Sequence, residues 1–505
     1  MRRSLVALLV ALATVAGPGP LAGRAAAEVP IVVLEGNGFG HGVGLAQHGA
    51  RWMAEAGRST DQILAHFYPG TALGQATGVV RVAVLSADDR RAVLEFPQGG
   101  EVRSPRSGPQ APGFPVRIAS GGQVSVRFDG GYRVEPLVTG QAATRDGQLL
   151  PPLLPTPTTQ PRRDGGGGGG GDGGGGNEGG APAPDGAPTT TTQPPSPAPQ
   201  PPPPAQPAPP AGEPAPPSPG SPGSPTPPPT PVSAAPVWAV PDGGGTVAVP
   251  GRGRQYRGVV EATAAAGPLR LVNEVDVETY LKGMAEVPGS WPGAALGAQA
   301  VAARTYALRA MAAGGEICDD QRCQVYVGIT GENAGMNGAV EATRNQVVTH
   351  GGALAAAVYS ADAGGFTATT LEGFGTPDGV YPYLQAVRYD TPDPLPWRVE
   401  VSTADLARRV GYPGTLTGVR LTGTGPSGRA LEVTLDGDQG SRAVPGLRFA
   451  RALGLRSTLF TVTLGAADTA PPPPAAVSPL QAFPDDADAM AEDNLSGPSV
   501  ARQVA

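Results

Sequence analysis

A long low-complexity tract is the feature that most constrains how this chain can fold. Residues 151–236 contain a polyglycine block, a threonine run and long proline-rich runs. Such a composition cannot bury enough apolar surface to offset the entropy that is lost when a chain is ordered. We therefore expect this tract to be disordered or extended, so the folded part must come from the sequence on either side of it.

The sequence on both sides of the tract has the pattern of short strands. Alternating apolar and polar residues, separated by turn residues, predict strands within 79–137, and the pattern resumes between 246 and 275. Neither set of strands carries a helical layer of its own. We interpret the tract as a long insertion within one folded unit rather than as a linker between two domains.

Composition and charge narrow the possible functions. The 505 residues include 76 glycines and 60 prolines, and the formal net charge is -7, so the composition gives no indication of nucleic-acid binding. Residues 1–27 combine a basic start, a short apolar run and small residues, which predicts a secretory signal peptide and a secreted protein. An uncleaved anchor is the alternative, and no later stretch is long and apolar enough to span a membrane.

Two predicted helices with an acid between them form the centre of the chain. Asp276 is a suitable N-cap for the first helix, and Pro288 ends it, because proline disfavours helical geometry in the preceding residue. This leaves Glu286 beside a helix terminus. Ser290 is a natural N-cap for the second helix, with Pro292 in its first turn.

The second predicted helix carries Gln299, Arg304 and Tyr306. Arg304 shares a helical face with apolar residues, so its guanidinium is predicted to point inward, where it needs a partner. Two interpretations remain open for this arginine. It forms a structural ion pair with Glu286, or it holds Glu286 as a catalytic acid.

A glycine-rich segment near the N-terminus contains His41, His48 and His66. Its glycines do not fit the dinucleotide-binding pattern, so a nucleotide site is not expected. The histidine spacing matches no strong metal-ligand pattern, and we expect hydrogen-bonding roles for His48 and His66. His41 lies in the glycine-rich bend and is the functional candidate.

Two helices are predicted to follow that bend. The first covers residues 43–56 and stops at Gly57. Ser59 and Gln62 form a capping box for the second, which ends near Tyr68.

The cysteines and a polar loop complete the set of candidate residues. Outside the cytosol, Cys318 and Cys323 are expected to form a disulfide; the alternative, half of a metal site, lacks a flanking histidine, and we expect no metal or cofactor. A predicted strand at 353–360 runs into a loop suited to close ligand contact. That loop supplies Ser360, Asp362, Gly364 and Gly365. Alternatively, Asp362 bonds its own backbone in a tight hairpin.

Several of these motifs resemble the SpoIID/LytB family of bacterial cell-wall proteins. The resemblance rests on Glu286-Val-Pro, Ser-Trp-Pro, the run AQAVAARTY at 298–306, and the segment Tyr-Ser-x-x-x-Gly-Gly-Phe-Thr at 359–367. The Gly-His-Gly-x-Gly-x-x-Gln-x-Gly-Ala motif, with His41 and Gln47, comes first here, whereas many relatives carry it near the C-terminus. Val287 stands where the family usually has methionine.

The resemblance implies a peptidoglycan lytic transglycosylase. Glu286 would be the single general acid and base that cleaves the MurNAc–GlcNAc strand and leaves 1,6-anhydro ends, with a pKa raised by partial burial. Arg304 would orient the substrate. The expected substrate-binding residues are Gln299, Tyr306, Ser360, Asp362, Gly364, Gly365, His41 and Gln47. The sequence shows no second catalytic carboxylate near Glu286. Asp362, Glu372 and Asp378 are candidates for that role only if folding brings them close to it.

The family also implies an alternative function and two partners. The alternative is a non-catalytic wall-binding enhancer of an amidase, and the partners are peptidoglycan glycan strands and a cell-wall amidase. The expected fold is α+β, with mixed β-sheet lobes around a central helical segment. The expected organisation is a signal peptide (1–27), a Gly-His-Gly segment (28–75), a β-rich part (76–150), the disordered insertion (151–236), a catalytic part (237–465) and a disordered tail (466–505).

Overall fold

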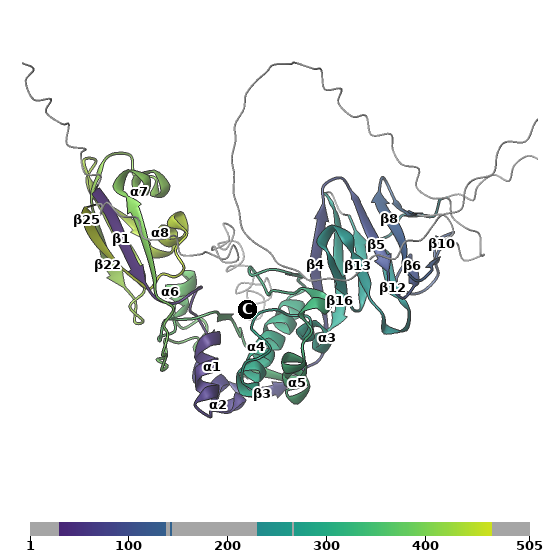
Figure 1. Ribbon diagram of the computed structural model, residues 1–505, viewed down its shortest axis with the longest axis horizontal. Helices are drawn as coiled ribbons and strands as arrows, with labels where there is room; N and C mark the ends of the chain where they lie inside the picture. The colour runs from purple at the N-terminus through teal and green to yellow at the C-terminus, as the bar shows by residue number, and fades with distance from the viewer. Residues whose placement is uncertain (1–29, 138–141, 144–229, 265–266, 467–505) are drawn as a thin grey trace, which may run out of the picture. The chain divides into compact units, whose positions relative to one another are not determined.

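The computed structural model describes residues 30–137, 142–143, 230–264 and 267–466 (Figure 1). The predicted signal peptide, most of the predicted insertion and nearly all of the predicted tail lie outside the described residues. The described residues form helices together with strands in several sheets, which confirms the α+β class. Among the described residues, no helix is long and apolar enough to cross a membrane.

Two sheets make up the β-rich part. The strand order is β10-β7-β6-β12-β15-β16-β4-β17 in the larger sheet and β11-β9-β8-β5-β13-β14 in the smaller one. Their bounds are β4 (Val79–Ala87), β5 (Arg91–Phe96), β6 (Gly100–Arg103), β7 (Val116–Ile118), β8 (Gly122–Phe128), β9 (Tyr132–Pro136), β10 (Ala142–Ala143), β11 (Val232–Ser233), β12 (Val237–Pro241), β13 (Val247–Val249), β14 (Arg254–Tyr256), β15 (Val259–Thr263), β16 (Leu269–Asp276) and β17 (Ile317–Cys318).

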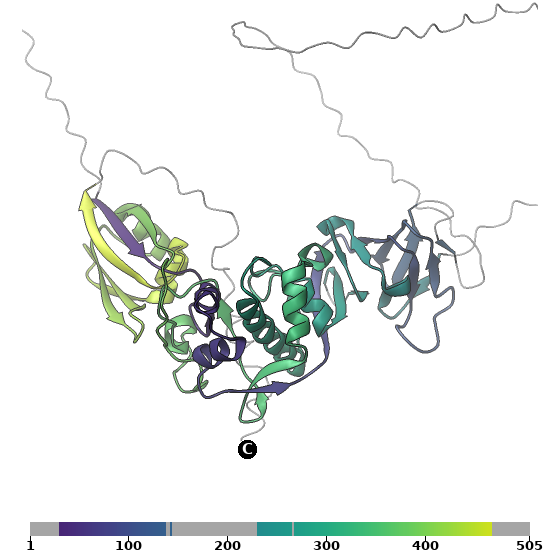
Figure 2. The same ribbon diagram turned by 60° about the horizontal axis from the view of Figure 1, so that its bottom comes forward.

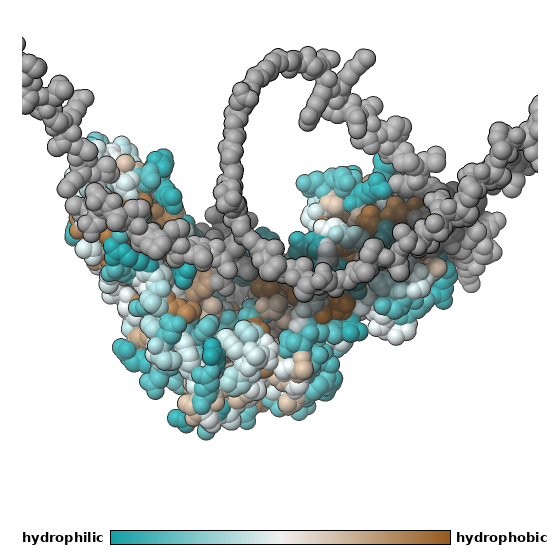
Figure 3. Space-filling view, viewed as in Figure 1, coloured by the Kyte–Doolittle hydropathy of each residue, from teal (hydrophilic) through white to brown (hydrophobic). Residues whose placement is uncertain are grey.

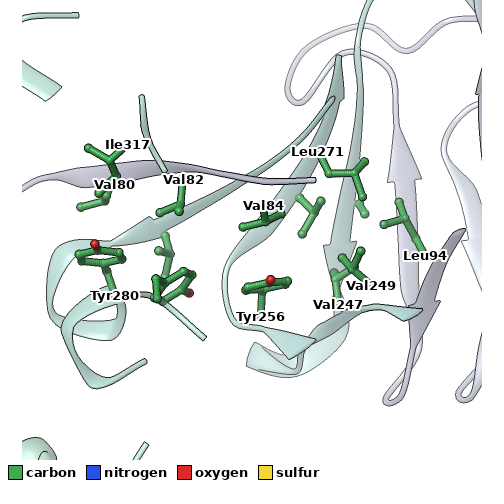
Figure 4. Close-up of a cluster of buried hydrophobic side chains, with 14 of the residues drawn as sticks. Val80, Val82, Val84, Leu94, Val247, Val249, Tyr256, Leu271, Tyr280 and Ile317 are labelled. Atoms are coloured by element: carbon green, nitrogen blue, oxygen red, sulfur yellow. The ribbon is translucent and has the colours of Figure 1, made fainter. Parts of the chain in front are cut away.

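Alternating side chains of these strands form a shared apolar core. Val80, Val82 and Val84 of β4 are buried and alternate with more exposed residues, as the period of a strand requires. Figure 4 shows the β4 valines together with side chains of the smaller sheet and of a neighbouring helix; the labelled residues are Val80, Val82, Val84, Leu94, Val247, Val249, Tyr256, Leu271, Tyr280 and Ile317. The burial of these side chains holds the two sheets together.

Strands from before and after the low-complexity tract pair directly with each other. β4 is antiparallel to β16, β6 to β12, and β5 to β13. The two segments therefore contribute to the same sheets, which is the arrangement that the insertion interpretation requires.

Helices form a second part around α4 (Gly293–Ala312), as Figures 1 and 2 show. α1 (Gln47–Glu55), α2 (Thr60–Phe67), α3 (Val277–Lys282) and α5 (Ala334–Ala342) all contact it. Gly297 illustrates why small residues matter on α4: a Cβ there would lie 2.6 Å from the Oγ1 of Thr60. Figure 3 shows hydrophilic residues over much of the surface near α1 and α2 in this view.

A third part contains the first and last described strands side by side. β1 (Pro30–Gly36) lies between β21 (Trp397–Ser402) and β25 (Phe460–Ala466). A second small sheet has β22 (Leu416–Thr424), β23 (Ala430–Gly437) and β24 (Arg442–Pro445), and α7 (Thr403–Val410) and α8 (Gly446–Leu453) pack with both.

Short elements connect these parts. They are β2 (Leu45–Ala46), β3 (Ala72–Gln75), β18 (Gln346–His350), β19 (Ala353–Leu354), β20 (Tyr359–Ser360) and α6 (Thr370–Phe374). β2 pairs in parallel with β20, so the Gly-His-Gly segment lies against the strand that precedes the Gly-Gly loop.

Some helix boundaries follow the sequence and others do not. The capping box of Ser59 and Gln62 is confirmed, and so is the Asp276 N-cap, which accepts from two backbone N–H groups. α1 starts at Gln47 rather than at residue 43, because Val43 lies in a β-bridge, Gly44 has a positive φ and β2 occupies Leu45–Ala46. The predicted Ser290 N-cap is wrong: Pro292 occupies that position.

Candidate active site

Glu286 lies in an extended segment between α3 and α4. α3 ends at Lys282, so the expectation that Pro288 terminates this helix is wrong. The segment pairs with residues 325–327 instead: the Ala285 N–H donates to the Val325 carbonyl at 2.9 Å, and the Val327 N–H donates to the Gly283 carbonyl at 3.0 Å. These bonds fix the backbone immediately before Glu286.

Three donors hold the carboxyl group of Glu286. Its Oε1 accepts from the Val325 N–H at 2.6 Å and from the Tyr359 hydroxyl at 3.3 Å. Its Oε2 accepts only a long bond of 3.5 Å from Nε2 of Gln47. The side chain is partly exposed, so Oε2 retains capacity for another partner.

Burial raises the pKa of Glu286 above its ordinary value. The hydrogen bonds from Val325, Gln47 and Tyr359 act in the opposite direction, because they favour the ionised form, but they do not cancel the effect of burial. Among the described residues, no other carboxylate and no arginine is a partner of this group. The site therefore favours the protonated acid, which is the form that a general acid needs.

A relay of buried polar side chains orients the donor Tyr359. The Tyr280 hydroxyl donates to Oε1 of Gln324, and Nε2 of Gln324 donates to the Tyr359 hydroxyl, both at 2.9 Å. Since Gln324 occupies an acceptor position of that hydroxyl, the Tyr359 proton is free to point at Glu286. Burial and the charge of Glu286 raise the pKa values of Tyr280 and Tyr359. Tyr306 raises them too, but by a smaller amount.

Gln47 contacts Glu286, and Gln299 contacts Gln47. Nε2 of Gln47 donates to Oε1 of Gln299 at 3.2 Å as well as to Glu286. Both glutamines are buried, at 6% and 2% exposure, and Nε2 of Gln299 has no hydrogen-bond partner. The bond to Gln299 restrains Gln47, which in turn contacts the acid.

His41 and Ser360 tie the Gly-His-Gly bend to β20. Oγ of Ser360 accepts from the Gly42 N–H at 3.2 Å, and Nδ1 of His41 accepts from the Val43 N–H at 3.0 Å. Burial lowers the pKa of His41 to about 4, although a hydrogen bond with the backbone of Tyr359 acts to raise it. His41 is therefore neutral at physiological pH, and both side chains hold the strand that carries Tyr359.

Arg304 is not a partner of Glu286, and its assignment to substrate orientation is wrong. It is completely buried and forms a bidentate pair with Glu278, with Nε–Oε1 at 2.9 Å and Nη2–Oε2 at 2.6 Å. Its Nη1 donates to the Gln346 carbonyl. A buried arginine needs a carboxylate, and Glu278 in α3 supplies it, so the pair holds α3 against α4.

Asp362 is a structural residue, and its assignment to sugar contact is wrong. The side chain has no exposed surface, and its Oδ1 accepts from the Gly364 N–H at 2.5 Å and from the Tyr389 hydroxyl at 3.3 Å. This is the tight hairpin that the sequence left open as the alternative. Burial raises the pKa of Asp362 to about 6.

The other two candidate acids also have structural roles. Glu372 is completely buried, shares a capping box with Thr369, and accepts from Ser427. Asp378 accepts from the Thr370 hydroxyl and from the Leu371 N–H. Neither carboxylate is a recorded partner of Glu286.

Gly364 and Gly365 line a separate hollow of about 480 Å³. Both have positive φ, of 70° and 88°, which glycine adopts without strain. Arg388 and Ser427 line the same hollow, but Glu286 does not. A second hollow of about 470 Å³, beside Trp397, does not include Glu286 either.

Two residues of the site were missed by sequence reasoning, Gln324 and Tyr359. Gln324 directly follows Cys323, which forms the expected disulfide with Cys318. Their roles come from contacts across 35 and 73 residues of sequence. Tyr359 opens the Tyr-Ser-x-x-x-Gly-Gly-Phe-Thr segment, which was a signal for it, whereas no local pattern marks Gln324.

The chain matches a known protein family around this acid. The model described as SpoIID, Stage II sporulation protein, matches residues 265–350, which include α3, Glu286 and α4. Together with the relatives below, this match shows that the segment around Glu286 is similar to proteins of the SpoIID/LytB family.

Three relatives extend this comparison. An amidase enhancer of Bacillus subtilis is 38% identical over 122 residues, which is 24% of this chain and 16% of the relative. The stage II sporulation protein D of Bacillus amyloliquefaciens is 44% identical over 45 residues, or 9% of this chain and 13% of the relative. An uncharacterized protein of Brachyspira hyodysenteriae is 29% identical over 220 residues, or 39% of this chain and 59% of the relative. The chain thus spans less than two thirds of each relative, and no solved structure matches it.

Proposed function

We propose that this protein is a peptidoglycan lytic transglycosylase in which Glu286 is the single general acid and base. Similarity to proteins of the SpoIID/LytB family supports a function related to the bacterial cell wall. The observation that carries the finer proposal is a partly exposed carboxyl group whose pKa is raised by burial and whose recorded partners include no second carboxylate.

Among the described residues, no other carboxylate takes part in the hydrogen bonds of Glu286 or in the interactions that shift its pKa, and this favours an intramolecular attack by the substrate. Hydrolytic glycosidases use a second carboxylate as base or nucleophile. The three other candidate acids of this chain are Asp362, Glu372 and Asp378, and each of them bonds to protein groups away from Glu286. The C6 hydroxyl of the muramic sugar would then act as the nucleophile.

The proposed reaction moves one proton out and one proton back. Glu286 donates its proton to the oxygen that links MurNAc to GlcNAc, and the bond from C1 of MurNAc to that oxygen breaks. The C6 oxygen of the same MurNAc forms a new bond to C1, and its proton goes to the Glu286 carboxylate. The products are a free GlcNAc hydroxyl and a 1,6-anhydro end, with no water consumed and no change of oxidation state.

The hydrogen bonds around Glu286 suit both halves of this cycle. Burial favours the protonated form of Glu286, whereas the donors Val325, Tyr359 and Gln47 stabilise the carboxylate that forms after the proton leaves. A carboxyl group balanced in this way is able to give up its proton and then recover it.

Product analysis of isolated glycan strands tests the proposal. The protein without residues 1–27 is incubated with purified strands, and the new ends are identified by mass, since an anhydro end is lighter than a reducing end by one water molecule. We expect anhydro ends from the parent protein and none from Glu286→Gln. Glu341→Gln is the matched control, because Glu341 is a surface acid paired with Lys282. Reducing ends from the parent, or unchanged products from Glu286→Gln, would refute the proposal.

A second candidate is a non-catalytic enhancer of a cell-wall amidase, favoured by the name of the Bacillus subtilis relative. In that case the protein would bind glycan strands without cleaving them and would raise the turnover of an added amidase. Glu286→Gln would leave that stimulation unchanged, which separates this candidate from the first.

Export completes the proposed function. We propose that residues 1–27 direct secretion and that the protein acts at the cell wall. Fractionation of the producing cells checks this, because the mature chain should be found outside the cytoplasm and should begin near Glu28.

A further inference from the structure

We propose that Trp291 is the stacking platform of a carbohydrate subsite beside Glu286. The class of ligand, a pyranose of the glycan strand, rests on the proposed function. The platform itself rests on the position, the exposure and the neighbours of this indole ring.

Trp291 is close to Glu286 both along the chain and through α1. Five residues separate them, so their Cα atoms are at most roughly 17 Å apart. The Trp291 N–H donates to the Pro288 carbonyl at 3.1 Å, and this turn shortens the path further. On α1, Gln47 contacts Glu286, and the next residue, His48, contacts Trp291.

Side chains of α1 hold the indole in place. The His48 ring meets it edge-on, with 5.2 Å between centroids, and the Arg51 guanidinium lies 5.7 Å from the centroid of the Trp291 ring. His48 is in turn backed by Trp52 at 5.6 Å. A cation over an indole and an edge-on ring are both favourable arrangements, so Trp291 is restrained before any ligand arrives.

The partial exposure of Trp291 argues against a purely structural role. Aromatic residues that serve the core here, such as Phe67 and Tyr280, have no exposed surface. Trp291 packs on that core with one part and remains partly open to solvent with the rest. A restrained, partly exposed indole offers apolar surface at low entropic cost, which suits the C–H face of a sugar ring.

Its neighbours also differ from those of a core tryptophan. Arg51 and His48 are polar, and burial together with the charge of Arg51 lowers the pKa of His48, so the histidine adds no positive charge of its own. The result is an aromatic surface with one cation above it, in reach of the acid that cleaves the strand.

Binding measurements in an inactive background test this subsite. The parent is Glu286→Gln, and the probe is purified, uncrosslinked glycan strand, titrated by calorimetry. We expect Trp291→Ala to weaken binding about tenfold and Trp291→Phe to recover part of that loss. Trp238→Ala is the matched control, because Trp238 is also partly exposed and lies under Arg81 and Arg106, but on β12 of the larger sheet.

A second readout does not depend on a folded alanine variant. Oxidation of tryptophans by N-bromosuccinimide, mapped by mass spectrometry, should be slowed by the strand at Trp291 and not at Trp238. Equal oxidation of Trp291 with and without strand, or binding by Trp291→Ala within about twofold of its parent, would overturn the subsite.

The outcomes separate this inference from the proposed function. If Glu286→Gln abolishes anhydro products while Trp291→Ala binds normally, the catalytic proposal stands and the platform fails. If the protein forms no products but Trp291→Ala loses binding, the platform stands as part of a wall-binding surface and the catalytic proposal fails.

Discussion

The carboxyl group of Glu286 shows how a few neighbours set the chemistry of one residue. Burial raises its pKa, and donors from three distant segments of the chain lower it again. Of these donors, the Tyr359 hydroxyl is the one that can be removed with the least change of shape, since phenylalanine keeps the ring.

Tyr359→Phe should raise the pKa of Glu286 further, because a hydrogen bond to the ionised form is lost. A general acid is active while protonated, so the alkaline limb of kcat/KM against pH should move to higher pH by roughly half a unit. The pH profile of strand cleavage measures this shift. Tyr412→Phe, which loses a bond to the Gly440 carbonyl in another part of the fold, is the control. An unchanged limb, or a shift to lower pH, would show that Tyr359 does not tune the acid.

The buried pair of Arg304 and Glu278 gives a stability prediction. Glu278→Gln leaves the Arg304 cation without a charged partner in a site that excludes water. We expect the free energy of unfolding to fall by about 3–5 kcal/mol, measured by urea denaturation. The double variant Glu278→Leu, Arg304→Met should lose less than the single variant, because no uncompensated charge remains. A loss below about 1 kcal/mol for the single variant would contradict this account.

His41 gives a prediction about pH and stability. The pKa of His41 is about 4 in the folded protein and 6.5 in the unfolded chain. Its contribution to the free energy of unfolding is therefore complete above pH 6.5 and is lost as the pH falls toward 4. The contribution is about 3 kcal/mol. The difference in unfolding free energy between the parent and His41→Gln should therefore shrink by that order between pH 7 and pH 4.

That comparison uses a difference because Asp362 acts in the opposite sense. Its pKa is raised from 3.8 to about 6, so its protonation stabilises the folded protein as the pH falls through the same window. The Asp362 contribution is common to the parent and to His41→Gln and cancels. A difference that stays constant with pH would show that His41 is not buried in its neutral form.

At the scale of elements, local sequence signals predicted the helix caps and strands, which depend on bonds between residues close together in the sequence. The Ser59–Gln62 box, the Asp276 cap and the strands around the tract were predicted because caps and alternation involve residues a few positions apart. The environment of Glu286 was not predictable in this way. Its ladder partner, residues 325–327, lies about forty residues away. Gly283, the C-cap of α3, is a local stop signal, but it does not indicate what the following segment pairs with.

The Arg304 error has the same physical origin. The sequence predicted correctly that this arginine is buried, but it considered only Glu286 as the acid near Arg304, whereas the partner is Glu278 of α3. Which of two carboxylates meets a buried guanidinium is decided by the packing of α3 on α4. Packing of this kind is not encoded in the spacing of residues along the chain.

The strand pairings across the low-complexity tract lead to an element-level prediction. Because β4 pairs with β16, β5 with β13 and β6 with β12, a cut within residues 151–227 breaks none of these ladders. We expect limited proteolysis there to give two fragments that separate on a denaturing gel but elute together in gel filtration. Fragments that elute apart while each stays folded would show two independent domains.

At the scale of the whole molecule, the site is assembled from segments that are far apart in the sequence. The N-terminal Gly-His-Gly segment supplies Gln47, the centre of the chain supplies Glu286, and β20 supplies Tyr359. The first and last described strands, β1 and β25, are neighbours in one sheet. An early position of the Gly-His-Gly motif is thus compatible with its contact to the acid, since neighbouring ends allow such a rearrangement.

The most direct test of the central claim is cleavage of glycan strands in water enriched with heavy oxygen. If Glu286 transfers its proton while the C6 hydroxyl attacks C1, the new anhydro ends contain no oxygen from water, and we predict unlabelled ends that disappear in Glu286→Gln. Labelled reducing ends would show hydrolysis instead, and they would contradict the single-acid mechanism.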